Sequence, residues 1–152
     1  MKKHTLRNLM QSYSSEIGEV KMDQEEIENI INTSKNIEVL REEKGYIFFQ
    51  YLDVKMELYS DEDYNRMRVI SAITKYSNLA PKIKDSLMDS NFHLALDTRY
   101  GVADDTLYSV FMHPLFSLTR DDFESALEQV YNLAKSFGKT YRSAQIEFTK
   151  KK

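Results

Sequence analysis

Cysteine is absent from this chain of 152 residues, and glycine and proline are scarce, with only four and two copies. Without cysteine there can be no disulfide, no zinc–thiolate site and no thiol catalysis. So few glycines and prolines argue against a linker-rich or disordered chain. No window approaches the 18 apolar residues of a membrane span, and the first apolar residues are interspersed with polar ones. We therefore expect no membrane helix and no signal peptide, and a cytoplasmic location.

A concentrated basic surface is also missing, because the formal net charge is −3. Binding to nucleic acid needs lysines and arginines gathered on one face, so we predict no nucleic-acid partner. The two basic runs, Met1–His4 and Lys150–Lys152, lie at the ends of the chain and are typical of solvated tails. Hydrophobic content of 41% and charged content of 30% are ordinary for one globular domain of this length.

The first 22 residues form an N-terminal amphipathic helical extension in our interpretation. Apolar residues recur at helical spacing over four turns, namely at Leu6, Leu9, Met10, Tyr13, Ile17 and Val20. This stripe could dock on its own domain, swap onto a partner, or become ordered only on binding. We expect the main domain to span residues 23–138 and a C-terminal tail to span residues 139–152.

The first half of the main domain reads as a helix followed by strands. Asp23 is a good N-cap for a short helix over about Gln24–Ser34, with acidic residues in its first turn. Runs rich in aromatic and β-branched residues, or alternating between apolar and polar, then predict strands. These runs are Ile37–Leu40, Tyr46–Leu52, Val54–Tyr59 and Arg66–Thr74.

The second half is organised as helix, strand, turn, strand and capped helix. Apolar periodicity predicts helices at Tyr76–Asn91 and Thr119–Phe137, and strands at His93–Tyr100 and Leu107–His113. Thr119 is the expected N-cap of the last helix, with Asp122 at its third position. Helices that each hide one apolar stripe must cover a sheet. We therefore predict an α+β fold in which helices flank an antiparallel sheet of about five strands.

Four segments of the chain carry a resemblance to a known family. They are Leu87–Phe92, Leu94–Asp97, Val110–Leu115 and the last helix over Asp122–Ala134. Together with the order helix, three strands, helix, two strands, helix, they make residues from about Asp23 to Phe137 resemble the type III secretion chaperone-like superfamily. That superfamily includes the Tir-chaperone group and the YbjN-like bacterial proteins, so the resemblance implies a bacterial protein.

The resemblance implies a small acidic homodimer without a cofactor. In the secretion chaperones, hydrophobic sheet surface holds an extended segment of a client protein, whereas YbjN-like members are described as regulators. Two features depart from the secretion-chaperone pattern: the extra segment Thr5–Val20 and a slightly long turn at Val102–Thr106. Both favour the YbjN-like group, so we expect a chaperone-like or regulatory protein.

Candidate catalytic and metal-binding residues are few. His93 and His113 would face each other if the late turn centred near Ala103, but two histidines are short of the three ligands of a catalytic metal. Asp61–Asp63 resembles the start of a cation loop but lacks the glycine and distal glutamate of a calcium loop. No phosphate-binding glycine loop or nucleophile elbow is present. We predict no catalytic, cofactor or metal site, and hence no enzyme.

The aromatic and apolar strands are the best candidates for a binding surface. They hold more aromatic side chains than one helix layer needs, which is consistent either with a thick core plus a dimer contact or with a groove for an extended peptide. The expected protein-binding residues are Phe48, Phe49, Tyr51, Met56 and Leu58. The expected homodimer contacts are Leu79, Ile83, Leu87, Tyr108, Val110 and Met112.

The sequence therefore favours a non-enzymatic module that binds an extended segment of a partner protein as a homodimer. The alternative is a small-molecule sensor or enzyme with a pocket between sheet and helix near His93 and His113. That alternative needs convergent polar groups inside the pocket.

Overall fold

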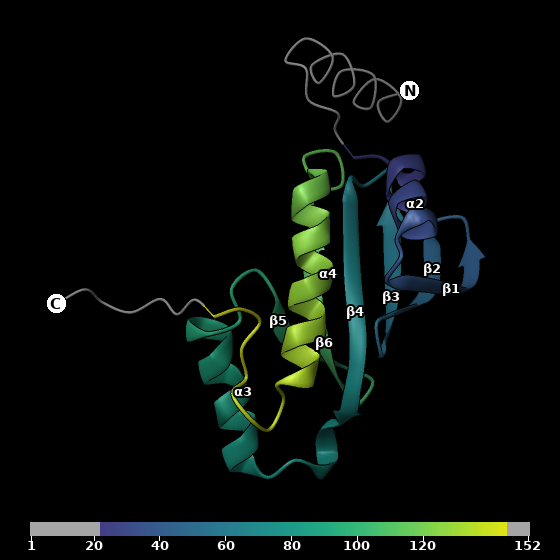
Figure 1. The fold of residues 1–152 in the computed structure, drawn as a ribbon. Helices are drawn as coiled ribbons and strands as arrows, with labels where there is room; N and C mark the ends of the chain where they lie inside the picture. Colours follow the sequence, from purple (N-terminus) through teal and green to yellow (C-terminus); the bar gives the residue numbers. More distant parts are fainter. Residues whose placement is uncertain (1–21, 146–152) are drawn as a thin grey trace, which may run out of the picture.

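The computed structural model describes residues 22–145 and forms one sheet with helices on it (Figure 1). Along the chain the elements are α2 (Gln24–Thr33), β1 (Ile37–Glu43), β2 (Tyr46–Tyr51), β3 (Val54–Asp61), β4 (Arg66–Lys75), a 3-10 turn (Tyr76–Asn78), α3 (Pro81–His93), β5 (Arg99–Ala103), β6 (Thr106–His113) and α4 (Arg120–Lys135). The apolar stripe over Leu6–Val20 and the C-terminal lysines lie outside the described residues.

The sheet has six antiparallel strands in the order β1-β2-β3-β4-β6-β5. The α+β class with an antiparallel sheet is confirmed, but the expected count of five strands is one too low. The count of five follows the order of three and two strands, whereas six segments were predicted as strands. Arg66–Thr74, the segment that this order leaves out, is the central strand β4, which pairs with both β3 and β6.

Local side-chain chemistry sets where α2 and α4 begin. The Asp23 carboxylate accepts a hydrogen bond from the backbone N–H of Glu26 at 2.8 Å, as expected for an N-cap. At α4, Thr119 and Asp122 form a capping box, in which each side chain accepts from the other residue's backbone N–H. Both predicted caps are confirmed.

The main core lies between one face of the sheet and the helices α2 and α4. Along β2, β4 and β6, residues alternate between buried and partly or fully exposed, as expected for strands with one covered face. The buried side chains of β2, β3, β4 and β6 meet those of both helices in one apolar cluster. Figure 1 shows the two helices on the same side of the sheet, with α4 over β4 and β6.

A smaller cluster holds α3 against the same side of the sheet. Leu87 of α3 packs with Tyr100 of β5, Leu107 of β6 and Leu133 of α4. The buried Tyr100 hydroxyl donates a hydrogen bond to the Leu133 carbonyl at 2.8 Å. This side of the sheet is therefore occupied by all three helices.

The predicted strand at His93–Tyr100 is wrong. Helix α3 continues through His93, and the chain then turns until β5 starts at Arg99. Two polar contacts replace the expected ladder: the Asn91 side chain bonds both backbone groups of Tyr100, and the Thr98 hydroxyl donates to the Ala95 carbonyl. The alternation in Leu94–Asp97 is therefore that of a turn with one buried alanine, Ala95.

Candidate protein-binding face

The face of the sheet opposite α2 and α4 carries no helix among the described residues. We call this surface the open face and define it by the outward-pointing residues of β2, β3, β4 and β6. They are Tyr46, Phe48, Gln50, Lys55, Glu57, Tyr59, Arg68, Ile70, Ala72, Tyr108, Val110 and Met112, none of which is fully buried. One face of an antiparallel sheet can be exposed to water, but such a face usually carries polar side chains.

Apolar side chains cross the centre of the open face in one row. The register pairs Phe48 with Glu57, Glu57 with Ile70, and Ile70 with Val110. Three of the four positions in this row are thus apolar, although none of the helices within residues 22–145 covers them. Met112, two residues beyond Val110, is 66% exposed. A row of this kind departs from the polar pattern of a solvated face and indicates a contact surface.

A compact polar cluster borders this row. The hydroxyls of Tyr46 and Tyr59 both donate to the same oxygen of Glu57, at 2.8 and 2.9 Å. The centroids of the two rings lie 5.0 Å apart. The Arg68 guanidinium stacks over the Tyr59 ring at 4.7 Å, and the Arg41 guanidinium over the Tyr46 ring at 5.0 Å. Burial, followed by the hydrogen bond to Glu57, raises the pKa of Tyr46 to about 12. At neutral pH the Tyr46 hydroxyl is therefore protonated and donates to Glu57 at the border of the row.

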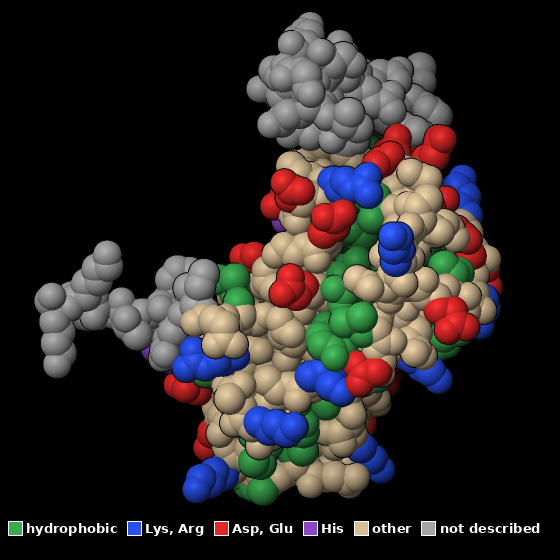
Figure 2. Space-filling view, viewed as in Figure 1, with side chains coloured by type: hydrophobic (Ala, Val, Ile, Leu, Met, Phe, Trp, Pro, Cys, Tyr) green, Lys and Arg blue, Asp and Glu red, His purple; other side chains and the backbone are tan. Residues whose placement is uncertain are grey.

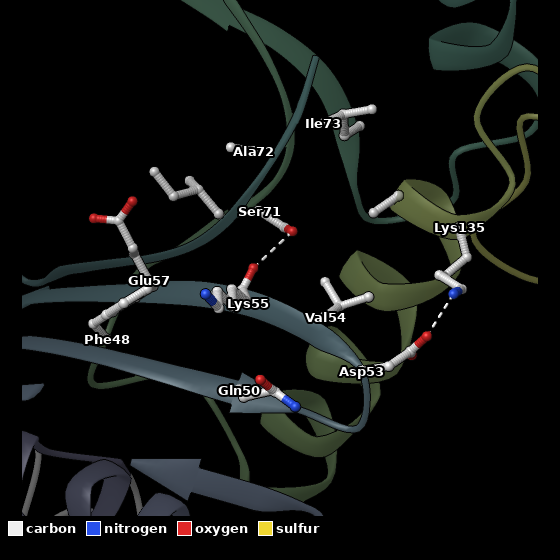
Figure 3. Close-up of a pocket in the computed structure, with 12 residues that line it drawn as sticks. Phe48, Gln50, Asp53, Val54, Lys55, Glu57, Ser71, Ala72, Ile73 and Lys135 are labelled. Atoms are coloured by element: carbon white, nitrogen blue, oxygen red, sulfur yellow. Dashed lines mark hydrogen bonds and ion pairs between the residues drawn. The ribbon is translucent and has the colours of Figure 1, made fainter. Parts of the chain in front are cut away.

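A cleft opens where β3 and β4 part (Figure 3). Their ladder ends at the pair Glu57–Ile70, although β3 starts three residues earlier and β4 runs on to Lys75. In the gap the Ser71 hydroxyl donates to the Lys55 carbonyl at 2.9 Å. The resulting cleft has a volume of ≈ 570 Å³. It is lined by Phe48, Gln50, Asp53, Val54, Lys55, Glu57, Ile70, Ser71, Ala72, Ile73, Ala134 and Lys135.

One end of the cleft carries an ion pair between the sheet and α4. Lys135 Nζ lies 2.6 Å from a carboxylate oxygen of Asp53, as Figure 3 shows. This hydrogen bond lowers the pKa of the Asp53 carboxyl and raises that of the Lys135 amine. Both groups are well exposed, so water and salt screen the pair. The cleft therefore combines an apolar wall with charges that solvent can reach.

The structure distributes the five expected protein-binding residues over both faces of the sheet. Phe49, Met56 and Leu58 are core residues with at most 1% exposure. Tyr51 lies on the helix side, with its ring 5.8 Å from that of Tyr131. Phe48 alone of the five lies on the open face and in the cleft. Three of the five side chains are buried in the core, and a binding role for the set stays a prediction.

The expected dimer contacts also separate into two groups. Tyr108, Val110 and Met112 lie on the open face, through β6. Leu79 and Leu87 pack in the smaller core cluster, and Ile83 is half-buried on α3. Instead, α3 exposes Met88 and Phe92, at 71% and 81%. The role of the six expected residues as dimer contacts stays a prediction.

The two histidines of the alternative function do not pair across a hairpin. His93 ends α3, where its ring lies 3.9 Å from the Asp89 carboxylate. His113 ends β6 opposite Met67, and its Nδ1 bonds the Pro114 carbonyl at 2.8 Å. Neither lines the cleft between β3 and β4.

Among the open-face residues that were not expected at the site are Lys55, Glu57, Arg68 and Ile70. The one available signal was parity in β4, where Ile70 shares its face with Arg66, Arg68 and Ala72. An apolar residue in that register is out of place on a solvated face. The parting of β3 from β4 has no such signal, because both segments keep strand-like alternation.

Within residues 22–145 no group of three or more histidine, aspartate or glutamate side chains is placed to hold a metal ion. None of the helices there has the length and apolar character needed to cross a membrane.

Comparison with known proteins gives structural but no sequence matches. No protein-family model matches the chain, and no curated protein matches it. The fold is similar to that in the ExsC–ExsE complex, with 15% identity, a TM-score of 0.46, and coverage of 88% of this chain and 90% of that one. It is also similar to a chain of the HopA1–SchA chaperone–effector complex, with 7% identity, a TM-score of 0.45, and coverage of 90% and 95%.

A third similar structure is the Yersinia pestis type III secretion chaperone SycH in complex with a stable fragment of YscM2. It shows 12% identity, a TM-score of 0.41, and coverage of 86% of this chain and 97% of that one. All three TM-scores lie between 0.41 and 0.46, so the function of this chain is argued from its own surfaces.

Proposed function

We propose that this protein is a non-enzymatic binding module that holds an extended segment of a partner protein on its open face. One observation carries the proposal: Phe48, Ile70 and Val110 form an apolar row on a sheet face that no described helix covers. Covering that row removes apolar surface from water, which favours association by about 25 cal/mol per Å². The sequence resemblance to chaperone-like and YbjN-like regulatory proteins points the same way.

The row has dimensions that suit an extended chain. It crosses four adjacent strands, or about 14 Å at 4.8 Å per strand, which is the length of about four extended residues. Apolar side chains of a partner would lie on the row, and its polar atoms would meet the rim formed by Tyr46, Glu57 and Arg68. The cleft beside Ser71 continues this surface to the end of the ladder.

The protein acts as a homodimer in this proposal, with α3 as the contact. Met88 and Phe92 are four residues apart on one helix and are among the most exposed large apolar side chains of the described chain. Because α3 packs on the side of the sheet that holds α4, this contact leaves the open face accessible. The two surfaces can therefore be tested separately.

Two methionines of similar exposure give a matched pair of variants. We expect Met112→Glu to abolish capture of peptides from an array of short extended sequences, while the mass in light scattering stays that of a dimer. We expect Met88→Glu to give a monomer that still binds peptides. Binding by Met112→Glu at the wild-type level, or no peptide binding by the wild type, would contradict the open-face proposal. A wild-type monomer would contradict the dimer.

A further inference from the structure

On the helix side, the apolar core is left partly uncovered between α2 and α4 (Figure 2). The register places Ile37, Tyr51 and Val54 in one row on that side, and Tyr131 of α4 lies against Tyr51. All four are only partly buried although they contact the main core. Figure 2 shows apolar side chains gathered between the two helices, with charged side chains around them.

A groove runs from this row up between the helices, and we call it the helix-side groove. Its volume is ≈ 420 Å³. The groove is lined by Ile30, Thr33, Ser34, Asn36, Tyr51, Arg120, Glu124, Ser125, Leu127 and Glu128. Ile30 and Leu127 belong to the core, so the groove reaches down to buried apolar atoms between α2 and α4.

Carboxylates outnumber cations along the groove. Glu124, Glu128 and Arg120 are its charged lining residues, and Arg120 pairs with Glu124 at 3.2 Å. A basic occupant would add a favourable charge partner for Glu128.

The chain itself supplies an occupant of the right chemistry. Residues 1–21 hold four basic and two acidic side chains, and their apolar stripe has helical spacing. The three basic residues farthest from the domain are Lys2, Lys3 and Arg7, while Gly18 stands just before the attachment point. Glycine weakens a helix at that position and permits a turn.

The attachment point lies at the head of the groove. Met22 is buried, and its backbone N–H donates to the carbonyl of Leu118, just before α4, at 3.2 Å. A helix over Thr5–Ile17 would be about 20 Å long, against about 15 Å for α2 and 24 Å for α4. A turn over Gly18–Lys21 therefore lets the stripe fold back along the whole groove.

From these observations we propose that Thr5–Ile17 folds back in the same molecule and packs its apolar stripe along the helix-side groove. The stripe covers Tyr51, Tyr131 and the groove floor. Arg7, about 15 Å from Ile17, comes level with Glu128, which is about 12 Å along α4 from Arg120. Because this groove lies opposite the open face, the proposal stands or falls independently of partner binding.

Disulfide trapping tests the docking directly, since the chain has no cysteine of its own. Ser125→Cys, an exposed position on the groove, is combined in the full-length chain with Met10→Cys or Tyr13→Cys of the stripe. The matched control is Ser15→Cys, which lies on the opposite side of the same helix, two and a half turns from Leu6. We expect intramolecular disulfides from at least one stripe pair to form at least about tenfold faster than from the control pair.

Charge provides a second readout. Glu124→Lys with Glu128→Lys, or an ionic strength of 1 M where the screening length is about 3 Å, should slow trapping severalfold. Equal trapping rates for stripe and control cysteines would overturn the proposal. A tethered segment that does not dock would bring both sides of its helix to the cysteine at position 125 equally often. Disulfides between two chains would overturn it too, since they would assign the groove to a second copy.

Discussion

Phe48 and Phe49 are neighbours in β2, yet we expect their truncation to have opposite consequences. Phe49 is 0% exposed and pairs in register with Met56, which is 1% exposed. Phe48 points to the open face and pairs with Glu57. Replacing Phe49 by alanine should destabilise the fold and leave the proposed binding surface unchanged. Replacing Phe48 by alanine should weaken peptide binding and change the stability little.

The magnitudes follow from burial. Phe49→Ala removes a fully enclosed ring and leaves a cavity in the main core, so it should cost about 3–5 kcal/mol. Phe48→Ala removes a partly buried ring at the surface and leaves no enclosed cavity, so about 1 kcal/mol is expected. A domain of ordinary stability has about 5–15 kcal/mol in total. The first variant therefore loses a large share of its stability and the second very little.

Urea unfolding followed by circular dichroism measures both values. With a slope of about 2 kcal/mol per molar urea, Phe49→Ala should lower the midpoint by about 2 M and Phe48→Ala by about 0.5 M at most. Peptide capture below the transition should fall for Phe48→Ala and persist for Phe49→Ala. Equal shifts of the two midpoints would refute the assignment of Phe48 to an uncovered face.

Three other variants test local features. Thr119→Ala removes the α4 cap and should cost about 1 kcal/mol in urea unfolding, whereas the exposed Thr140→Ala should change nothing measurable. Tyr100→Phe loses the buried hydrogen bond to Leu133 and should cost about 1 kcal/mol by the same assay. The raised pKa of Tyr46, about 12 against about 10 unfolded, gives stability that is present below pH 10 and lost as pH rises through 12. Comparing alkaline unfolding of the wild type and Tyr46→Phe checks this, and identical profiles would contradict it.

Much of the fold could be predicted from the sequence, because the capping residues and the apolar pattern indicate the same elements. Asp23 and Thr119 combine a capping side chain with an apolar run behind them, and both start helices where expected. The strands β2, β3 and β6 show their alternation directly in residue type. Such agreement between levels is what makes a segment's structure predictable.

The failures arise where one local pattern fits two structures. Leu94–Asp97 alternates like a strand, but polar bonds from Asn91 and Thr98 stabilise a turn there. The expected site mixed Phe48 with Phe49, Met56 and Leu58 because strand β2 is apolar on both faces, and composition does not tell which face is covered. That assignment depends on where α2 and α4 pack, and it is therefore a property of the tertiary structure.

The outer edges of the sheet are poor places to add a strand, and this favours the open face as the binding surface. Edge strand β1 carries a bulge between Val39 and Arg41 and a run of charged residues that ends at Glu43. The other edge, β5, is only five residues long and begins with Arg99. Bulges, charges and short length all hinder pairing at an edge. The apolar row has one charged member, Glu57, and three apolar members, Phe48, Ile70 and Val110, so an apolar partner segment is better accommodated on this face than at either edge.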